Sequence, residues 1–101
     1  MDRRLNLQEI LKNILGSNNV YFQPPETIKL SYPCIIYQRS GIEQKYADNL
    51  TYNAMVRYSV ILIGRSPESD IVKRILELPY CSYDRFYTAD GLNHDSFTLY
   101  Y

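Results

Sequence analysis

The stretch that decides the fold is TYNAMVRYSVILIG, which runs from Thr51 to Gly64. In a β-strand, residues two apart share a face, so this stretch divides into two faces. One face carries Tyr52, Ala54, Val56, Tyr58, Val60 and Leu62, and the other carries Met55, Arg57, Ser59, Ile61 and Ile63. Residues 60–63 are apolar on both faces, which is typical of a central strand. We predict a long strand over 51–64 that begins outside the core and ends inside it.

Two strand segments come before this one. Residues 32–39, YPCIIYQR, predict a strand with Pro33 at its entrance, where a missing N–H is tolerated. Residues 20–22, VYF, are followed by Pro24 and Pro25, which cannot donate to a sheet ladder. This short run is therefore expected to be an edge strand.

Residues 40–50 join the two long strands and are more than a tight hairpin requires. Ile42, Tyr46 and Leu50 give this segment apolar points of attachment, with polar residues between them. Long loops usually have a function or are disordered. A hairpin tip without a role is one alternative, and an arm that extends toward a neighbouring molecule is the functional interpretation.

Two amphipathic helices are expected outside the sheet. The first starts at Asn6, where Glu9 completes a capping pattern, or one turn earlier at Asp2, and it ends at Gly16. The second has Ser66 as its N-cap, with Pro67 at the first helical position. Their apolar stripes are Leu7, Ile10, Leu11, Ile14 and Leu15 in the first helix, and Ile71, Val72, Ile75, Leu76 and Leu78 in the second.

The end of the chain predicts a β-hairpin whose register depends on its turn. A three-residue loop of Ala89, Asp90 and Gly91, with Gly91 in the left-handed region, gives one consistently apolar face. The predicted pairs are then Cys81 with Leu99, Tyr83 with Phe97, and Arg85 with Asp95. A two-residue turn of Asp90 and Gly91 places Asp84 opposite Phe97, which is a worse match.

The element order is α-β-β-β-α-β-β in a chain of 101 residues. This order predicts a single α+β domain with a mainly antiparallel sheet of four to five strands and two helices on one face. No apolar run reaches the roughly 20 residues of a membrane span, and the N-terminus has no signal-peptide core. We expect a cytosolic chain in which Cys34 and Cys81 are buried free thiols, with a disulfide as the alternative.

Composition and charge bear on the class of partner. The 11 Lys and Arg residues balance 11 Asp and Glu residues, so the net charge is zero, which argues against an electrostatic nucleic-acid binder. The chain also has 11 Tyr, 3 Phe and no Trp. So many amphipathic rings indicate surfaces that are partly buried against other proteins.

No catalytic, metal-binding or cofactor-binding residues are predicted. His94 stands beside Asp95 and Ser96, but adjacent strand residues point to opposite faces and cannot form a triad. We expect His94 to hydrogen-bond near a turn. No CxxC, HxH or HExxH spacing supports a metal site, and the glycines fall at the ends of elements instead of in a phosphate loop.

Several short strings in combination point to a family. They are YFQPPE at 21–26, YPCIIY at 32–37, YADN at 46–49, SPES at 66–69, DRFY at 84–87 and LNHD at 92–95. With the element order, this set resembles the small tail-terminator or tail-completion (head-tail joining) proteins of long-tailed bacteriophages. The resemblance covers nearly the whole chain.

The resemblance implies a structural virion protein without enzymatic activity or cofactors. Such proteins form a ring, usually a hexamer, that caps the head-proximal end of the tail tube, ends tube polymerisation and joins tail to head. The implied partners are further copies, the tail tube protein and a head-completion or connector protein, and no membrane. DNA passes through the lumen without specific recognition. The implied location is the head-tail interface of the virion, after assembly in the bacterial host cytoplasm.

The candidate interface residues lie in two places. Ile42, Tyr46, Asp48 and Asn49 in the arm are expected to contact the tail tube or the adjacent subunit. Tyr100 and Tyr101 end the chain on alternating faces, so one can continue the core while the other contacts a neighbour. The alternatives are a head-closure, connector or minor capsid component, or a non-catalytic cytoplasmic adaptor.

Overall fold

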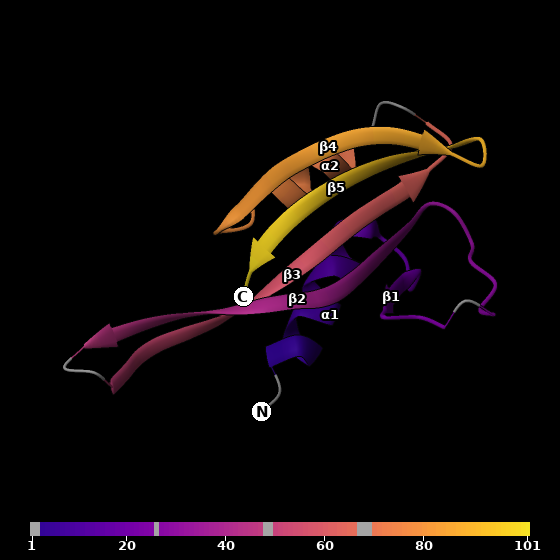
Figure 1. The fold of residues 1–101 in the computed structure, drawn as a ribbon. Helices are drawn as coiled ribbons and strands as arrows, with labels where there is room; N and C mark the ends of the chain where they lie inside the picture. The colour runs from indigo at the N-terminus through magenta and orange to yellow at the C-terminus, as the bar shows by residue number, and fades with distance from the viewer. Residues whose placement is uncertain (1–2, 26, 48–49, 67–69) are drawn as a thin grey trace.

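The protein folds as a five-stranded sheet with two helices on one face (Figure 1). The computed structural model describes residues 3–25, 27–47, 50–66 and 70–101, and of residues 43–47 and 50–54 the backbone alone. Its elements are α1 (Arg3–Leu15), β1 (Val20–Phe22), β2 (Cys34–Ala47), β3 (Leu50–Gly64), α2 (Asp70–Leu76), β4 (Cys81–Ala89) and β5 (Leu92–Tyr100). The strand order is β1-β2-β3-β5-β4. The predicted α+β class and element order are confirmed.

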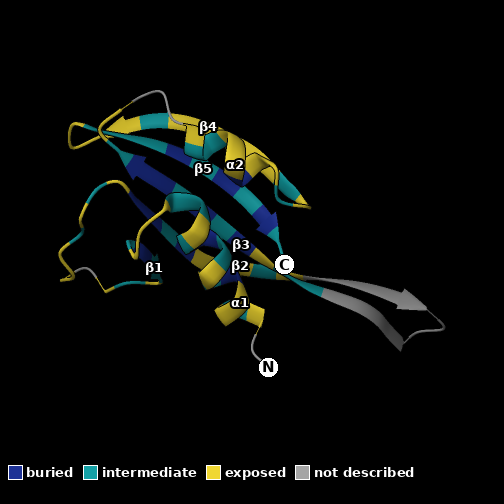
Figure 2. Ribbon diagram, turned by 180° about the vertical axis from the view of Figure 1, so that it is seen from behind, coloured by how far each residue is buried: buried dark blue, intermediate teal, exposed yellow. Residues whose placement is uncertain are grey.

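The core lies between the sheet and the helices. β3 is the central strand, with β2 and β5 antiparallel on either side of it, while β1 runs parallel to β2. Buried positions concentrate on the middle strands beneath the helices (Figure 2). The buried cluster comprises Leu7, Leu11, Val20, Ile35, Tyr37, Tyr58, Val60, Leu62, Ile75, Phe97 and Leu99. We call this side of the sheet the helix-covered face and the other side the open face.

Helix α1 begins at Arg3, one turn before Asn6, so the predicted start at Asn6 is wrong and the earlier alternative fits. The added turn brings Arg3 and Arg4 over aromatic rings, those of Tyr101 and Phe22, at 4.6 and 4.4 Å from the ring centroids. The helix ends as predicted: Gly16 has a φ of 81° and donates its N–H to the Lys12 carbonyl.

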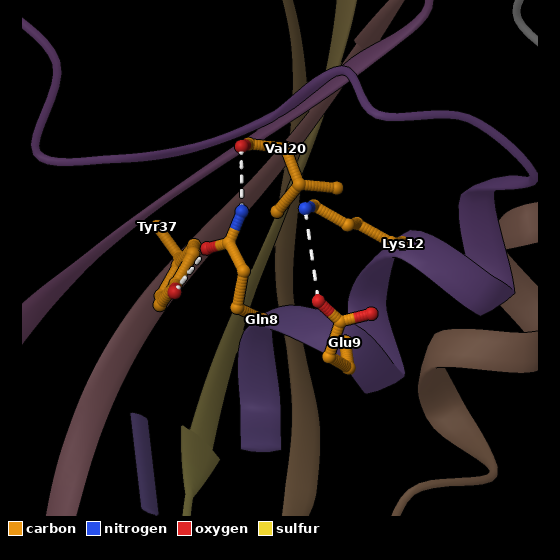
Figure 3. Close-up of polar contacts among 5 residues, drawn as sticks. All are labelled: Gln8, Glu9, Lys12, Val20 and Tyr37. Atoms are coloured by element: carbon orange, nitrogen blue, oxygen red, sulfur yellow. Dashed lines mark hydrogen bonds and ion pairs between the residues drawn. The ribbon is translucent and has the colours of Figure 1, made fainter. Parts of the chain in front are cut away.

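A glutamine on α1 fixes the helix to the sheet (Figure 3). The Gln8 amide donates to the Val20 carbonyl over 2.9 Å, and its oxygen accepts the Tyr37 hydroxyl proton. One side chain therefore joins α1 to both β1 and β2. Because Tyr37 is fully buried, this pairing also satisfies a polar group that would be costly to leave alone.

Helix α2 is shorter than the predicted apolar stripe. Ile75 is buried, but Leu76 is 41% exposed, so its expected place in the core is wrong. The predicted N-cap, Ser66, is described, whereas the predicted first helical position, Pro67, lies outside the described residues. Leu78 follows the helix and packs partly buried against the core.

The predicted loop over 40–50 is wrong, because β2 and β3 continue through it as a paired ribbon. Their ladder runs to Ala47 opposite Leu50. Register shifts occur between Arg39 and Gly41 and again between Lys45 and Tyr46. These irregularities explain the error, since a bulge interrupts the alternation by which a strand is read from sequence.

The β4–β5 hairpin departs from the predicted register near its turn. Ala89 pairs with Leu92, so the turn has two residues, Asp90 and Gly91, with φ angles of 54° and 74°. Two positive φ angles are what a tight Asp-Gly hairpin turn favours. The predicted three-residue loop is therefore wrong.

A bulge reconciles this turn with part of the predicted pairing. The register shifts between Tyr83 and Arg85, so Asp84 is an extra residue in β4. Beyond it, the predicted pairs Cys81–Leu99 and Tyr83–Phe97 are confirmed, whereas the predicted pair Arg85–Asp95 is wrong. Arg85 lies opposite Ser96, and Asp95 lies opposite Phe86.

Candidate functional site

The distal part of the β2–β3 hairpin extends beyond the sheet as a two-stranded ribbon (Figure 1). β1 pairs with β2 only from Ile35 to Tyr37, and β5 pairs with β3 only from Arg57 onward. Residues 43–47 and 50–55 therefore pair with each other alone in the sheet ladders. We call these residues the ribbon. It gives the chain a longest extent of 51 Å, against 24 and 23 Å in the other directions.

At the root of the ribbon, the Arg57 side chain lies across Gly41 and hydrogen-bonds to Ser40. The Arg57 guanidinium donates to the Ser40 hydroxyl over 3.2 Å and to the Ser40 carbonyl over 3.0 Å. The same hydroxyl donates to the Arg57 carbonyl. A Cβ on Gly41 would meet the guanidinium at 2.7 Å, so the absence of a side chain at Gly41 lets Arg57 lie across the strand.

Of the four arm residues predicted to form an interface, the structure describes Ile42 and the backbone of Tyr46. Ile42 lies at the root, opposite Val56, and is 56% exposed. Tyr46 is part of β2. Asp48 and Asn49 lie outside the described residues. Their contacts with a neighbour stay a prediction.

The two terminal tyrosines lie beside this root. Tyr101 packs against the core, lies under Arg3, and donates its N–H to the Val56 carbonyl. Tyr100 pairs with Arg57 and donates its N–H to the Tyr80 carbonyl. Both side chains are half-buried. Of the two, Tyr101 is the one that continues the core, and a role in subunit contacts stays a prediction for both.

A mainly apolar cavity of about 380 Å³ opens between the C-terminus and the ribbon root. Its walls include Met55 of β3, Leu78, Tyr80, Tyr100 and Tyr101. Tyr80 is 71% exposed. The cavity therefore adds an exposed aromatic ring to the apolar surface near the ribbon.

The second notable surface is the free edge of β4, which the sequence did not indicate as a site. β4 pairs with β5 on one side, and its residues are mostly exposed. Tyr83 and Phe86 are 41% and 46% exposed there, so Tyr83, which the predicted register places on an apolar face, lies outside the buried core. Beside them, Asp95 is only 8% exposed. The one sequence signal for this site is Asp95, a carboxylate at a strand position that shares a face with the core residues Phe97 and Leu99.

Tyr83 and Asp95 are joined directly. The Tyr83 hydroxyl donates to Oδ1 of Asp95 over 2.6 Å, and its ring meets Phe97 edge-on at 5.3 Å between centroids. The hydrogen bond to Asp95, followed by burial and the negative charge of Asp95, raises the pKa of Tyr83 to about 12. Tyr83 therefore stays a hydrogen-bond donor throughout the physiological pH range.

His94, Asp84 and Asp95 are spread over both faces of the β4–β5 hairpin. His94 stacks on Tyr87 with 4.7 Å between ring centroids, and its Nδ1 lies 3.2 Å from the Leu92 carbonyl oxygen. The hydrogen bond near the turn that the sequence predicts for His94 is therefore present. Asp84 accepts a hydrogen bond from Thr98 on the open face, away from Asp95. The structure does not bring these groups together.

Both cysteines are free thiols. Cys34 is buried, and burial raises its pKa to about 11. Cys81 is half-buried instead of buried as predicted, and burial together with the charge of Asp84 raises its pKa. Neither thiol is therefore activated as a nucleophile.

Within the described part of the chain, no three His, Cys, Asp or Glu side chains are grouped in a way that could hold a metal ion. Neither α1 nor α2, the helices that the structure describes, has the length and apolar character needed to cross a membrane. Comparisons of the chain with protein-family models, curated proteins and solved structures found no match.

Proposed function

We propose that this chain is a structural assembly protein of the tail-terminator kind. In this proposal, copies form a ring that caps the head-proximal end of a phage tail tube, ends tube polymerisation and joins the tail to a head connector. The observation that carries the proposal is the ribbon, which extends from the sheet without support from β1 or β5. The proposal also rests on the resemblance of the sequence strings to that family.

A ribbon of this kind needs a partner surface for physical reasons. A two-stranded hairpin alone is at best marginally stable in water, whereas a third strand or a packed surface stabilises it. The ribbon has free backbone groups along both outer edges, since its strands pair only with each other. Contact with a neighbouring subunit or a tube would satisfy those groups.

The surface around the root fits a protein contact better than exposure to water. Ile42 is 56% exposed and Tyr80 is 71% exposed, and Tyr80 lines the apolar cavity next to Met55. Aromatic and aliphatic side chains at the edge of an apolar pocket are the usual anchors of protein interfaces. These residues support an assembly role for the end of the molecule from which the ribbon extends.

The test removes the ribbon and leaves the sheet intact. Glu43 and Met55 lie opposite each other, so replacing residues 44–54 by Asn-Gly joins them through a tight turn. The shortened chain should keep its circular dichroism and thermal unfolding but should no longer stop polymerisation of the cognate tail tube protein. Tube lengths measured by negative-stain electron microscopy are the readout.

The matched control changes the other hairpin, where Asp90→Asn keeps a turn residue that tolerates positive φ. This variant should cap tubes as the unmodified chain does. If the shortened chain also caps tubes at normal length, the ribbon has no part in capping and the proposal fails. A chain that stays monomeric with and without tubes would instead indicate an adaptor.

A further inference from the structure

β4 is the edge strand on one side of the sheet. It offers nine residues, whereas β1 at the opposite edge has three. An unpaired strand edge is a ready template for another strand unless charge, bulges or covering elements protect it. The only irregularity in β4 is the bulge at Asp84. This edge is therefore able to accept a strand from another molecule.

The side chains near this edge, a buried carboxylate and two half-exposed aromatic rings, favour contact with a cationic group. Asp95 is buried on the helix-covered face with Leu62 on one side and Phe86 on the other. Its partner in the structure is the Tyr83 hydroxyl, and no Lys, Arg or His of the described residues lies within ion-pair distance of it. A buried carboxylate is costly without an opposite charge, and the half-exposed rings of Tyr83 and Phe86 are suited to cation–π contact.

The same chain carries a matching edge on β2. β1 stops at Phe22 opposite Tyr37, so no described strand pairs with the outer edge of β2 from Gln38 onward, where the Arg39 N–H donates to Oε1 of Gln23 over 3.3 Å. Arg39 lies opposite Tyr58 and Ile42 lies opposite Val56, and these two β3 residues belong to the core side of the sheet. Arg39 and Ile42 therefore lie on the helix-covered face, and both are exposed.

The two edges are complementary in spacing as well as in chemistry. Tyr83 and Phe86 are three apart on one face because the bulge at Asp84 lies between them. Arg39 and Ile42 are three apart on one face because a register shift lies between them as well. Pairing β4 with a second β4 would instead bring two Asp95 carboxylates together without a cation.

We propose that copies of this chain join head to tail, with the free β4 edge of one copy added to the outer edge of β2 at the ribbon root of the next. With the helix-covered faces on the same side, β4 and the added β2 run antiparallel, so Ile42 packs against Tyr83. Arg39 then lies beside Phe86 and reaches Asp95 of the other copy. Because the two patches differ, the contact is heterologous and generates a closed ring or an open filament. This inference deepens the proposed function by naming the contact between subunits.

Single substitutions test each half of the contact in the full chain. Asp95→Asn keeps the acceptor for Tyr83 and removes the charge, and Arg39→Glu reverses the charge on the other edge. Each should weaken self-association by more than about tenfold in sedimentation velocity, with an unchanged far-UV spectrum. The controls are Asp84→Asn, on the open face of β4, and Lys29→Glu, at an exposed loop position. Both should associate as the unmodified chain does.

A mixing experiment separates head-to-tail from two-fold association. The Asp95→Asn chain keeps a working β2 edge, and the Arg39→Glu chain keeps a working β4 edge. Each alone should be monomeric, and their mixture should form a 1:1 dimer that grows no further. Oligomers of normal size in either variant, or no complex in the mixture, would overturn the inference.

The tube assay keeps the two proposals apart. If both variants form normal rings that cap tubes, the proposed function holds and this contact is wrong. If the contact is established by mixing but the rings do not shorten tubes, the contact holds and the function as a tube terminator is wrong.

Discussion

The Tyr83 hydroxyl lies 2.6 Å from Oδ1 of Asp95, across a bulge that makes the two residues diagonal neighbours on β4 and β5. The bulge at Asp84 places Phe86, and not Arg85, opposite Asp95. The carboxylate that the sequence pairs with Arg85 is therefore a buried group that accepts a hydrogen bond from a phenol. Two of the predictions concern how such local pairings contribute to stability.

The first prediction concerns stability at alkaline pH. Tyr83 has a pKa raised to about 12 from an ordinary value of 10.0, first because of its hydrogen bond to Asp95. The folded state therefore binds this proton more tightly than the unfolded state does. Its contribution is fully present below pH 10 and is lost as the pH rises toward 12. Since water screens a side chain that is 41% exposed, the contribution is expected to be on the order of 1 kcal/mol.

The measurement is chemical unfolding at pH 9 and at pH 11.5 of the unmodified chain and of Tyr83→Phe. The difference in free energy of unfolding between the two chains should shrink at the higher pH. Tyr87→Phe, on the same strand, is the control for the loss of a phenol. An equal difference at both pH values would show that the Tyr83 proton does not contribute.

A second prediction concerns the clamp at the ribbon root. Gly41→Ala would place a Cβ 2.7 Å from Nη2 of Arg57, so the guanidinium must move away from Ser40. Because the Arg57 side chain is exposed and the close contact is with its terminal guanidinium, the global cost is expected to be below about 1 kcal/mol. Amide hydrogen exchange within the ribbon should rise clearly, since its root is released.

A double-mutant cycle with Arg57→Ala checks this cause. If the clash with Arg57 is responsible, Gly41→Ala should have a much smaller effect on exchange in the Arg57→Ala background. Gly64→Ala, where a Cβ would make an ordinary 3.6 Å contact with Pro33, is the matched control. Purely additive effects would assign the change to backbone propensity instead.

The sequence predicts elements well wherever alternation or helical spacing is unbroken. Val60 and Leu62 mark β3 as central, and Leu7 and Leu11 mark the buried side of α1. Prediction fails at the bulges, because one extra residue reverses the faces that alternation assigns. The register shift after Arg39 interrupts the alternation of faces, so the sequence predicts a loop where the ribbon strands lie.

The candidate site illustrates the same limit. From the sequence, the two-residue turn is the worse match because it places Asp84 opposite Phe97. In the structure Asp84 is the extra residue of a bulge, so the hairpin has one predicted register on the far side of the bulge and the other register next to the turn. The Phe86, Tyr83 and Asp95 cluster depends on that bulge and could not be read from spacing. Burial is a three-dimensional property, so the exposure of Tyr83 at a sheet edge also required the strand order.

A third prediction uses the two cysteines as probes of local opening. Cys34 is buried with its pKa raised to about 11, whereas Cys81 is half-buried. At pH 8, a thiol reagent should label Cys81 faster than Cys34, because Cys34 must be exposed and deprotonated before it reacts. Mass spectrometry of Cys34→Ala and Cys81→Ala chains assigns each rate. Equal rates in the folded chain, with both thiols labelled rapidly after unfolding, would contradict the prediction.

The last prediction compares two neighbouring residues of α1 that make different kinds of polar contact (Figure 3). Gln8→Ala removes the partner of the Val20 carbonyl and of the buried Tyr37 hydroxyl, so it should lower the free energy of unfolding by about 1–3 kcal/mol. Glu9→Ala removes an ion pair with Lys12 in which Nζ and Oε1 are 3.7 Å apart at the surface, and its cost should be below about 0.5 kcal/mol.

Denaturant unfolding of both variants measures this difference directly, and each serves as the other's control for loss of a side chain on α1. Tyr37→Phe combined with Gln8→Ala should cost less than the sum of the two single changes, since no hydroxyl is then left without its partner. Similar costs for Gln8→Ala and Glu9→Ala would mean that water reaches the Val20 carbonyl and Tyr37, and that Gln8 does not fix α1 to the sheet.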